Sequence, residues 1–200
     1  MLSTVKLRSG PADWAQAAPG DRPLRNLTSL ELRKRLEAAL ASGDGAAGAH
    51  CIHELWMRAE LGFDIDSALD LLWQRAAASI PEWLPMTHVE WLPLVYEIAA
   101  GFDAARKGRS NIYLVLLDYR DRRGAPFGIY VGMSDYTPAA RFDQHKAGIR
   151  ASGSVLKRGL EVLTGPTLHL QRIARAQAAA IETKLAEALA DAGLLVQGGH

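Results

Sequence analysis

The stretch YVGMSDYTPAARFDQHKAG, residues 130–148, decides the fold of this chain. It opens as a strand, and the similar aromatic and β-branched run NIYLV, residues 111–115, precedes it across a charged turn that contains glycine. Two such runs around a turn predict an antiparallel hairpin. The stretch then turns helical, because Pro138 suits a first helical turn and Gly148 ends the pattern.

Arg141 and His145 lie on this helix, four residues apart. That spacing puts them about 40° apart in projection, so both side chains can point at one phosphate group. An Arg guanidinium is always charged and suits phosphate oxygens, and a His can transfer protons near neutral pH. Such a pair most often marks a solvated helix face, but its place directly after the hairpin favours a functional site.

The rest of this half predicts a small α+β domain. Residues 154–160 read as a short helix, and TLHL, residues 167–170, reads as a possible third strand. An alanine-rich helix over about 171–192 follows, with Gly193 just beyond it. The predicted order is β-β-α-α-β-α, with helices flanking a small antiparallel sheet.

Glu182 is the candidate metal ligand on the last helix. Its neighbours on the same face are small or apolar, which predicts a buried carboxylate. A buried carboxylate needs a partner, and a hard cation such as Mg²⁺ is one that carboxylate oxygens bind well. A partly exposed Glu paired with Lys or Arg is the alternative.

The first half reads differently. Residues 1–26 are rich in Pro and Gly and predict an extended or loosely packed arm. Residues 27–106 predict a helical domain, which opens at a Thr28–Glu31 capping box and includes a later helix opened by Thr87 and Glu90. Its four tryptophans predict a helical core or, alternatively, a surface for a protein partner or self-association: Trp56, Trp73, Trp83 and Trp91.

Composition narrows the class of protein. The chain of 200 residues is 48% hydrophobic and 22% charged, which is typical of a folded globule. No apolar run approaches the roughly 20 residues that span a bilayer, and the first residues lack the apolar core of a secretory signal. With one cysteine, Cys51, the chain cannot form an internal disulfide, so a cytoplasmic location is expected.

Charge divides unevenly along the chain. Residues 105–200 hold 14 Lys or Arg and 8 Asp or Glu, a net charge of +6, whereas residues 1–104 have a net charge of −5. Polyanion binding depends on local positive potential, so the half that carries the motifs is the half suited to nucleic acid.

Together these features resemble the GIY-YIG nuclease family, in particular its small bacterial stand-alone members, over about residues 110–200. The resemblance implies a nuclease domain at 107–200 that hydrolyses phosphodiester bonds in DNA with one Mg²⁺ or Mn²⁺ ion per site. It implies Tyr113 as general base and Tyr130 as the group that contacts the phosphate or orients water. It also implies Glu182 as the metal ligand, and His145 is a candidate acceptor for the proton of Tyr113.

Further positions are candidates for substrate binding. Gly132 is expected to let the substrate backbone approach closely. Four cations are candidates for flanking phosphates: Lys146, Arg150, Lys157 and Arg158. The chain departs from the family in having Asn111 in place of a glycine, a long hairpin tip, and no asparagine after Glu182, for which Gln197 or His200 are possible substitutes.

These departures leave two alternatives open. One is a degenerate nuclease fold that acts as a nucleic-acid-binding or protein-interaction module. The other is a nuclease toxin or effector whose acidic helical region binds a partner.

Overall fold

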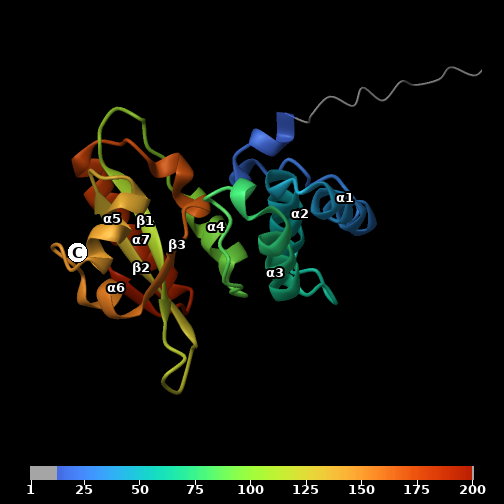
Figure 1. Ribbon diagram of the computed structural model, residues 1–200. Coiled ribbons are helices and arrows are strands. Elements are labelled where there is room, and N and C mark those ends of the chain that lie inside the picture. The colour runs from blue at the N-terminus through green and yellow to red at the C-terminus, as the bar shows by residue number, and fades with distance from the viewer. Residues whose placement is uncertain (1–12, 200) are drawn as a thin grey trace, which may run out of the picture.

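A computed structural model describes residues 13–199 of the chain (Figure 1). This part is an α+β structure with a four-stranded mixed sheet. The α-helices are α1 Ser29–Ser42, α2 Gly45–Met57, α3 Ile65–Ala76, α4 Leu92–Ala100, α5 Pro138–Lys146, α6 Gly153–Arg158 and α7 Arg175–Asp191. The 3-10 helices are η1 Asp13–Gln16, η2 Pro19–Asp21, η3 Ala77–Ser79 and η4 Gly165–Leu170. The strands are β1 Asn111–Asp118, β2 Phe127–Ser134, β3 Gly159–Val162 and β4 Val196–Gly198.

The sheet has the order β3-β1-β2-β4. The predicted hairpin is confirmed, with β1 antiparallel to β2 and Tyr113 opposite Gly132. β3 pairs antiparallel with the other side of β1, and β4 pairs parallel with β2. In Figure 1 the tip of the hairpin projects well beyond the rest of the sheet.

The third strand is not where the sequence placed it. Residues 167–170 lie in η4, because Pro166 suits the first turn of a helix and cannot donate to a strand ladder. The third strand is instead β3, which begins directly at the end of α6. β4 could not be predicted, because three residues are too few for a periodic pattern.

Two layers of helices cover the sheet. Helices α5 and α6 lie on one face, over a small apolar cluster that includes Tyr113, Val115 and Leu117. Helix α7 lies on the other face, where the alternate residues of β1 and β2 join the main core. The alternation of the strand therefore sends Tyr113 toward α5 and its neighbours toward α7.

The main core continues from the sheet into the helical half. Helix α4 packs on both α7 and η4, and Figure 1 shows it between the sheet and helices α2 and α3. The side chain of Glu161 on β3 adds a polar link, since it accepts hydrogen bonds from the backbone N–H groups of Met86 and Thr87 at 2.9 and 2.8 Å.

The start of the helical half agrees only in part with expectation. The Thr28–Glu31 capping box is present and opens α1. Helix α4 begins later than predicted, with Trp91 at its N-cap, so Thr87 caps no helix and Pro93 falls in the first turn. Residues 13–26 of the expected arm include η1 and η2, and Leu24 is buried because this segment packs on the helices. Residues 1–12 of the arm lie outside the described part of the chain.

Trp73 also differs from the core position that its spacing suggested. Trp56 is buried, whereas 58% of Trp73 is exposed on α3. In the part of the chain that the structure describes, no helix is both long and apolar enough to cross a membrane.

Candidate active site

Tyr113 and Tyr130 share the sheet face beneath α5. Their ring centroids lie 6.0 Å apart, and Tyr113 is only 2% exposed. Gly132 allows this arrangement, because a Cβ atom there would lie 2.6 Å from Cζ and Oη of Tyr113. Gly132 therefore makes room for the Tyr113 ring. Gly132 is itself buried, and the expected close approach of a substrate backbone to it stays a prediction.

His145 holds the hydroxyl group of Tyr113. Nε2 of His145 lies 2.9 Å from Oη of Tyr113, and the backbone N–H of Ser152 donates to Nδ1 of His145 at 2.9 Å. A nitrogen that accepts a hydrogen bond carries no proton, so the proton of the neutral ring is on Nε2. His145 therefore donates its Nε2–H to the Tyr113 oxygen.

Electrostatics favour the same protonation state. Burial, and then the nearby Arg141 charge, lower the pKa of His145 to about 4. Burial and the neighbouring Tyr130 raise the pKa of Tyr113, and Arg141 offsets part of this rise. In the protein alone both groups are neutral at pH 7. The expected role of His145 as acceptor of the Tyr113 proton does not fit this geometry, because its acceptor nitrogen is occupied by Ser152.

Arg141 lies one turn before His145 on α5, and Thr137 caps the start of that helix. Its guanidinium donates to Oε1 of Gln144 at 3.0 Å and to the carbonyl oxygens of Ile149 and Arg150 at 3.3 and 2.8 Å. Arg141 therefore braces the loop between α5 and α6 in addition to placing positive charge beside the tyrosines. The sequence pattern pointed only to the second role.

Glu182 reaches the sheet from the opposite layer. It is 7% exposed on α7, and its Oε1 accepts a hydrogen bond from the backbone N–H of Met133 at 3.2 Å. β4 pairs with β2 only as far as Val131, so Glu182 binds the edge of β2 just beyond that strand. The predicted burial of Glu182 is confirmed, and its carboxylate lies one residue along β2 from Gly132.

Glu182 brings to this edge a carboxylate, the kind of donor that a hard cation prefers. Mg²⁺ is commonly bound by one or two carboxylates, with water and substrate phosphate completing the octahedron. Residues 13–199 contain no group of three or more His, Cys, Asp or Glu placed to hold a metal. A closed structural zinc site is thus absent from that part of the chain, whereas a single-carboxylate site needs only Glu182.

The four candidate phosphate-binding cations divide into two pairs. Lys146 donates to the carbonyl oxygen of Gly159 at 3.1 Å, and Arg158 forms an ion pair with Asp121 at 2.8 Å. These two side chains contact the end of α6 and the base of the hairpin, and their expected contact with flanking phosphates stays a prediction. Arg150 and Lys157 are exposed.

Asn111, which departs from the family pattern, acts as a brace between loops. Its Oδ1 accepts from the backbone N–H of Arg172 at 2.9 Å, and its Nδ2 donates to the carbonyl oxygen of Tyr136 at 2.9 Å. A glycine has no side chain to make these bonds. These hydrogen bonds explain why an asparagine occupies this position, without the assumption that the nuclease site is degenerate.

Of the two expected substitutes for the missing asparagine, Gln197 contacts α6, where its Oε1 accepts from Oγ of Ser154 at 3.3 Å. His200 lies outside the described residues. Ser152 and Gln144 are the supporting residues that sequence reasoning missed. No sequence pattern marks either residue, because the hydrogen bonds that they make to His145 and Arg141 depend on how the chain between α5 and α6 folds.

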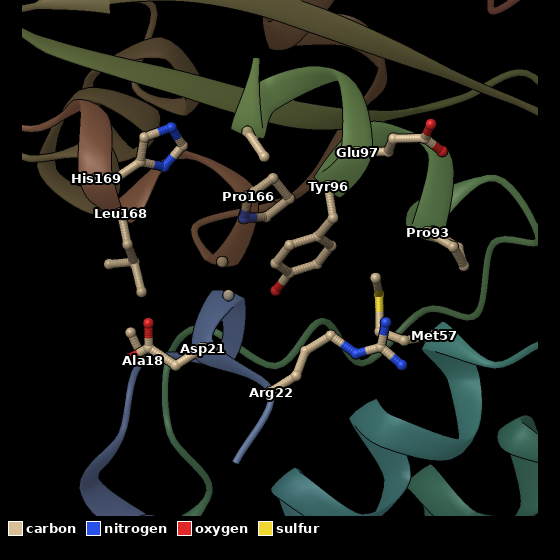
Figure 2. Close-up of a pocket in the computed structure, with 13 residues that line it drawn as sticks. Ala18, Asp21, Arg22, Met57, Pro93, Tyr96, Glu97, Pro166, Leu168 and His169 are labelled. Atoms are coloured by element: carbon tan, nitrogen blue, oxygen red, sulfur yellow. The ribbon is translucent and has the colours of Figure 1, made fainter. Parts of the chain in front are cut away.

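A separate pocket of about 610 Å³ lies where the helical half meets the sheet half (Figure 2). Its lining residues include Arg22, Tyr96, Pro166 and His169. The lining includes none of the residues around the Tyr113 hydroxyl group, which are Tyr113, Tyr130, Arg141 and His145. Arg22 pairs with Glu54 at 2.8 Å and His169 contacts two backbone carbonyls at 3.1 Å, whereas the buried hydroxyl group of Tyr96 has no hydrogen-bond partner among the described residues. The catalytic candidates lie outside this pocket, on strands β1 and β2 and on helices α5 and α7.

Comparisons with protein-family models, curated protein sequences and solved structures give no significant match.

Proposed function

We propose that this protein is a divalent-metal-dependent endonuclease of the GIY-YIG type that hydrolyses phosphodiester bonds in DNA. The observation that carries the proposal is the oxygen of Tyr113, which accepts Nε2–H of His145 beside Arg141 and Tyr130 on one sheet face. Three other groups, from β2 and α5, thus lie beside the hydroxyl oxygen of Tyr113. Resemblance of the motifs supplies the reaction class.

Tyr113 acts as the general base in this proposal. As a phenolate it takes a proton from the attacking water, whose oxygen forms a bond to phosphorus while the bond to the leaving oxygen breaks. His145 stabilises the phenolate by donating Nε2–H, and Ser152 keeps His145 in the tautomer that can do so. The raised pKa of Tyr113 means that the phenolate forms only when further positive charge enters the site.

Arg141 stabilises charge that develops on the phosphoryl oxygens. Preorganised donors of this kind lower a barrier because they need no reorientation during the reaction. The bonds to Gln144, Ile149 and Arg150 fix the guanidinium beforehand. Tyr130, half-buried beside Tyr113, is placed to contact the phosphate or the water.

Glu182 would hold the metal ion at the edge of β2. A bound Mg²⁺ or Mn²⁺ supplies positive charge to the phosphate and to the leaving oxygen. The position next to Gly132 supports this role, because Gly132 is the residue that pairs with Tyr113 across the hairpin.

Cleavage of supercoiled plasmid with Mg²⁺ tests the proposal. The informative variant is Glu182→Gln, which keeps an oxygen to accept the Met133 hydrogen bond but removes the charge. Glu187→Gln is the matched control, because Glu187 is an exposed residue of the same helix. We expect wild type and Glu187→Gln to nick the plasmid, and Glu182→Gln to lose this activity while retaining its circular dichroism spectrum.

Equal cleavage by Glu182→Gln and wild type would exclude Glu182 as the ligand, and no cleavage of plasmid or of branched DNA by wild type would reject the nuclease.

A further inference from the structure

We propose that a second surface of this protein binds the nucleic-acid backbone outside the catalytic cluster. We call it the basic ridge, and it consists of five exposed cations at the starts of β1 and α7: Arg106, Lys107, Arg109, Arg172 and Arg175. The proposal rests on the proposed function for the identity of the polymer as DNA. The ridge itself follows from how two distant segments meet.

Backbone hydrogen bonds hold the two halves of the ridge together. The N–H of Gly108 donates to the carbonyl oxygen of Arg172 at 2.9 Å, and Ser110 and Ile173 exchange hydrogen bonds at 3.1 and 2.8 Å. Gly108 is needed for this approach, because a Cβ atom there would overlap the carbonyl oxygen of Ile173. The contact brings together cations that are more than 60 residues apart in sequence.

The ridge has an excess of positive charge. Among the five cations, Arg109 forms an ion pair with Asp135 at 3.6 Å, and Arg106 donates to the carbonyl oxygen of Leu168 at 3.0 Å. Asp103 is the other carboxylate close to the ridge in sequence. The side chain of Arg109 is nevertheless 87% exposed. An exposed pair of this kind is weak, so Arg109 can exchange its carboxylate for a phosphate at little cost.

The ridge connects directly to the candidate active site. Arg109 precedes Asn111, the first residue of β1, and Tyr113 follows two residues later. At about 3.3 Å per extended residue, Arg109 and Tyr113 lie roughly 13 Å apart along the chain. A DNA strand with one phosphate at Tyr113 can therefore run onto the ridge within a few nucleotides.

An exposed aromatic residue next to the ridge favours nucleic acid over an acidic polypeptide. Tyr136 is 57% exposed, and its carbonyl oxygen is bonded to Nδ2 of Asn111. The bond from Oγ of Ser110 to Asp135, at 2.7 Å, fixes the same loop. An exposed ring on a loop next to cations is the combination that stacks on bases while the cations hold phosphates.

Fluorescence anisotropy with a labelled DNA duplex, in EDTA so that no cleavage occurs, tests the ridge. The variant is Arg109→Gln/Arg172→Gln. The matched control is Arg122→Gln/Arg123→Gln, which removes the same charge from exposed positions in the hairpin tip beyond the far end of β1. Wild type, ridge variant and control are each titrated over a series of salt concentrations.

We expect the ridge variant to weaken binding about tenfold. The slope of log K against log salt concentration should be smaller in magnitude by about 1.8 in this variant, because each lost phosphate contact reduces the slope by about 0.9. The control should stay within about twofold of wild type. A ridge variant with the affinity and slope of wild type would overturn the ridge and leave the nuclease proposal intact. Ridge-dependent binding without cleavage of plasmid or of branched DNA would support the ridge and reject the nuclease, and no binding by wild type would overturn the ridge.

Discussion

The backbone N–H of Ser152 donates a hydrogen bond to Nδ1 of His145, and this bond fixes the tautomer of a buried imidazole. Because Nδ1 of His145 accepts this bond, the proton of the ring is on Nε2, which faces the hydroxyl oxygen of Tyr113. A residue of the α5–α6 loop thereby decides whether His145 donates to or accepts from the tyrosine.

Replacement of His145 should separate the donor role from the acceptor role. In His145→Gln the side-chain amide can still donate an N–H to Tyr113, whereas His145→Leu removes the donor. Because a neutral donor stabilises the phenolate, we expect His145→Leu to lower plasmid nicking by a factor of about 10² or more. His145→Gln should retain clearly more activity than His145→Leu. Equal loss in both variants would argue that His145 transfers the proton itself.

The pH dependence of cleavage should report Tyr113. Burial raises the pKa of this phenol, so the phenolate fraction increases about tenfold per pH unit below that pKa. We expect the nicking rate under limiting enzyme to rise from neutral to alkaline pH without a plateau near pH 7. Tyr113→Phe should abolish the rise together with the activity. A rate that levels off near neutral pH would point to a different base.

Gly132→Ala should disturb the site directly, because the new methyl group would collide with the Tyr113 ring. Overpacking of this kind costs about 1–3 kcal/mol of unfolding free energy. The control is Gly153→Ala, since Gly153 has open space around its Cβ position and begins α6. Urea denaturation should show a loss of stability in Gly132→Ala alone. Equal stability of the two variants would mean that Tyr113 can move aside.

Arg141→Lys should be poorly tolerated although it keeps the charge. A lysine cannot span Gln144 and both loop carbonyls as the planar guanidinium does. We expect turnover to fall by a factor of about 10². Arg120→Lys serves as comparison, because Arg120 is an exposed arginine that forms an ion pair with Asp118 at the far end of β1 from Asn111. Single-turnover cleavage rates would be measured for both variants. A change below about threefold in Arg141→Lys would mean that the hydrogen bonds of Arg141 to the loop are not needed for catalysis.

His53 should make stability depend on pH. Burial lowers the pKa of His53 to about 3, below the ordinary value of 6.5 that applies in the unfolded chain. Between these values the unfolded chain binds more protons, so the stabilising effect is complete above about pH 6.5 and is lost as pH falls toward 3. We expect a loss of about 2 kcal/mol from pH 7 to pH 5. Denaturant titrations of wild type and His53→Gln at both pH values measure it, and an equal pH dependence in the two proteins would contradict the assignment.

The sequence by itself determined the elements whose signals are local. The hairpin could be predicted from two strand-like runs around a turn, and α1 from its Thr28–Glu31 capping box. Burial of Glu182 could be predicted from the small apolar residues on its helix face. Each signal depends on residues that are close in sequence, so no knowledge of the fold was required.

Tertiary structure alone decided the properties that depend on distant segments. β3 and β4 are too short to carry a periodic pattern, and pairing with β1 and β2 defines them. The role of Gly132 depends on the ring of Tyr113 across the hairpin, and the tautomer of His145 depends on a loop N–H. The basic ridge likewise exists only because Gly108 lets residues 106–110 lie against 172–175. A sequence pattern records which groups are present, whereas close packing decides which atoms they face.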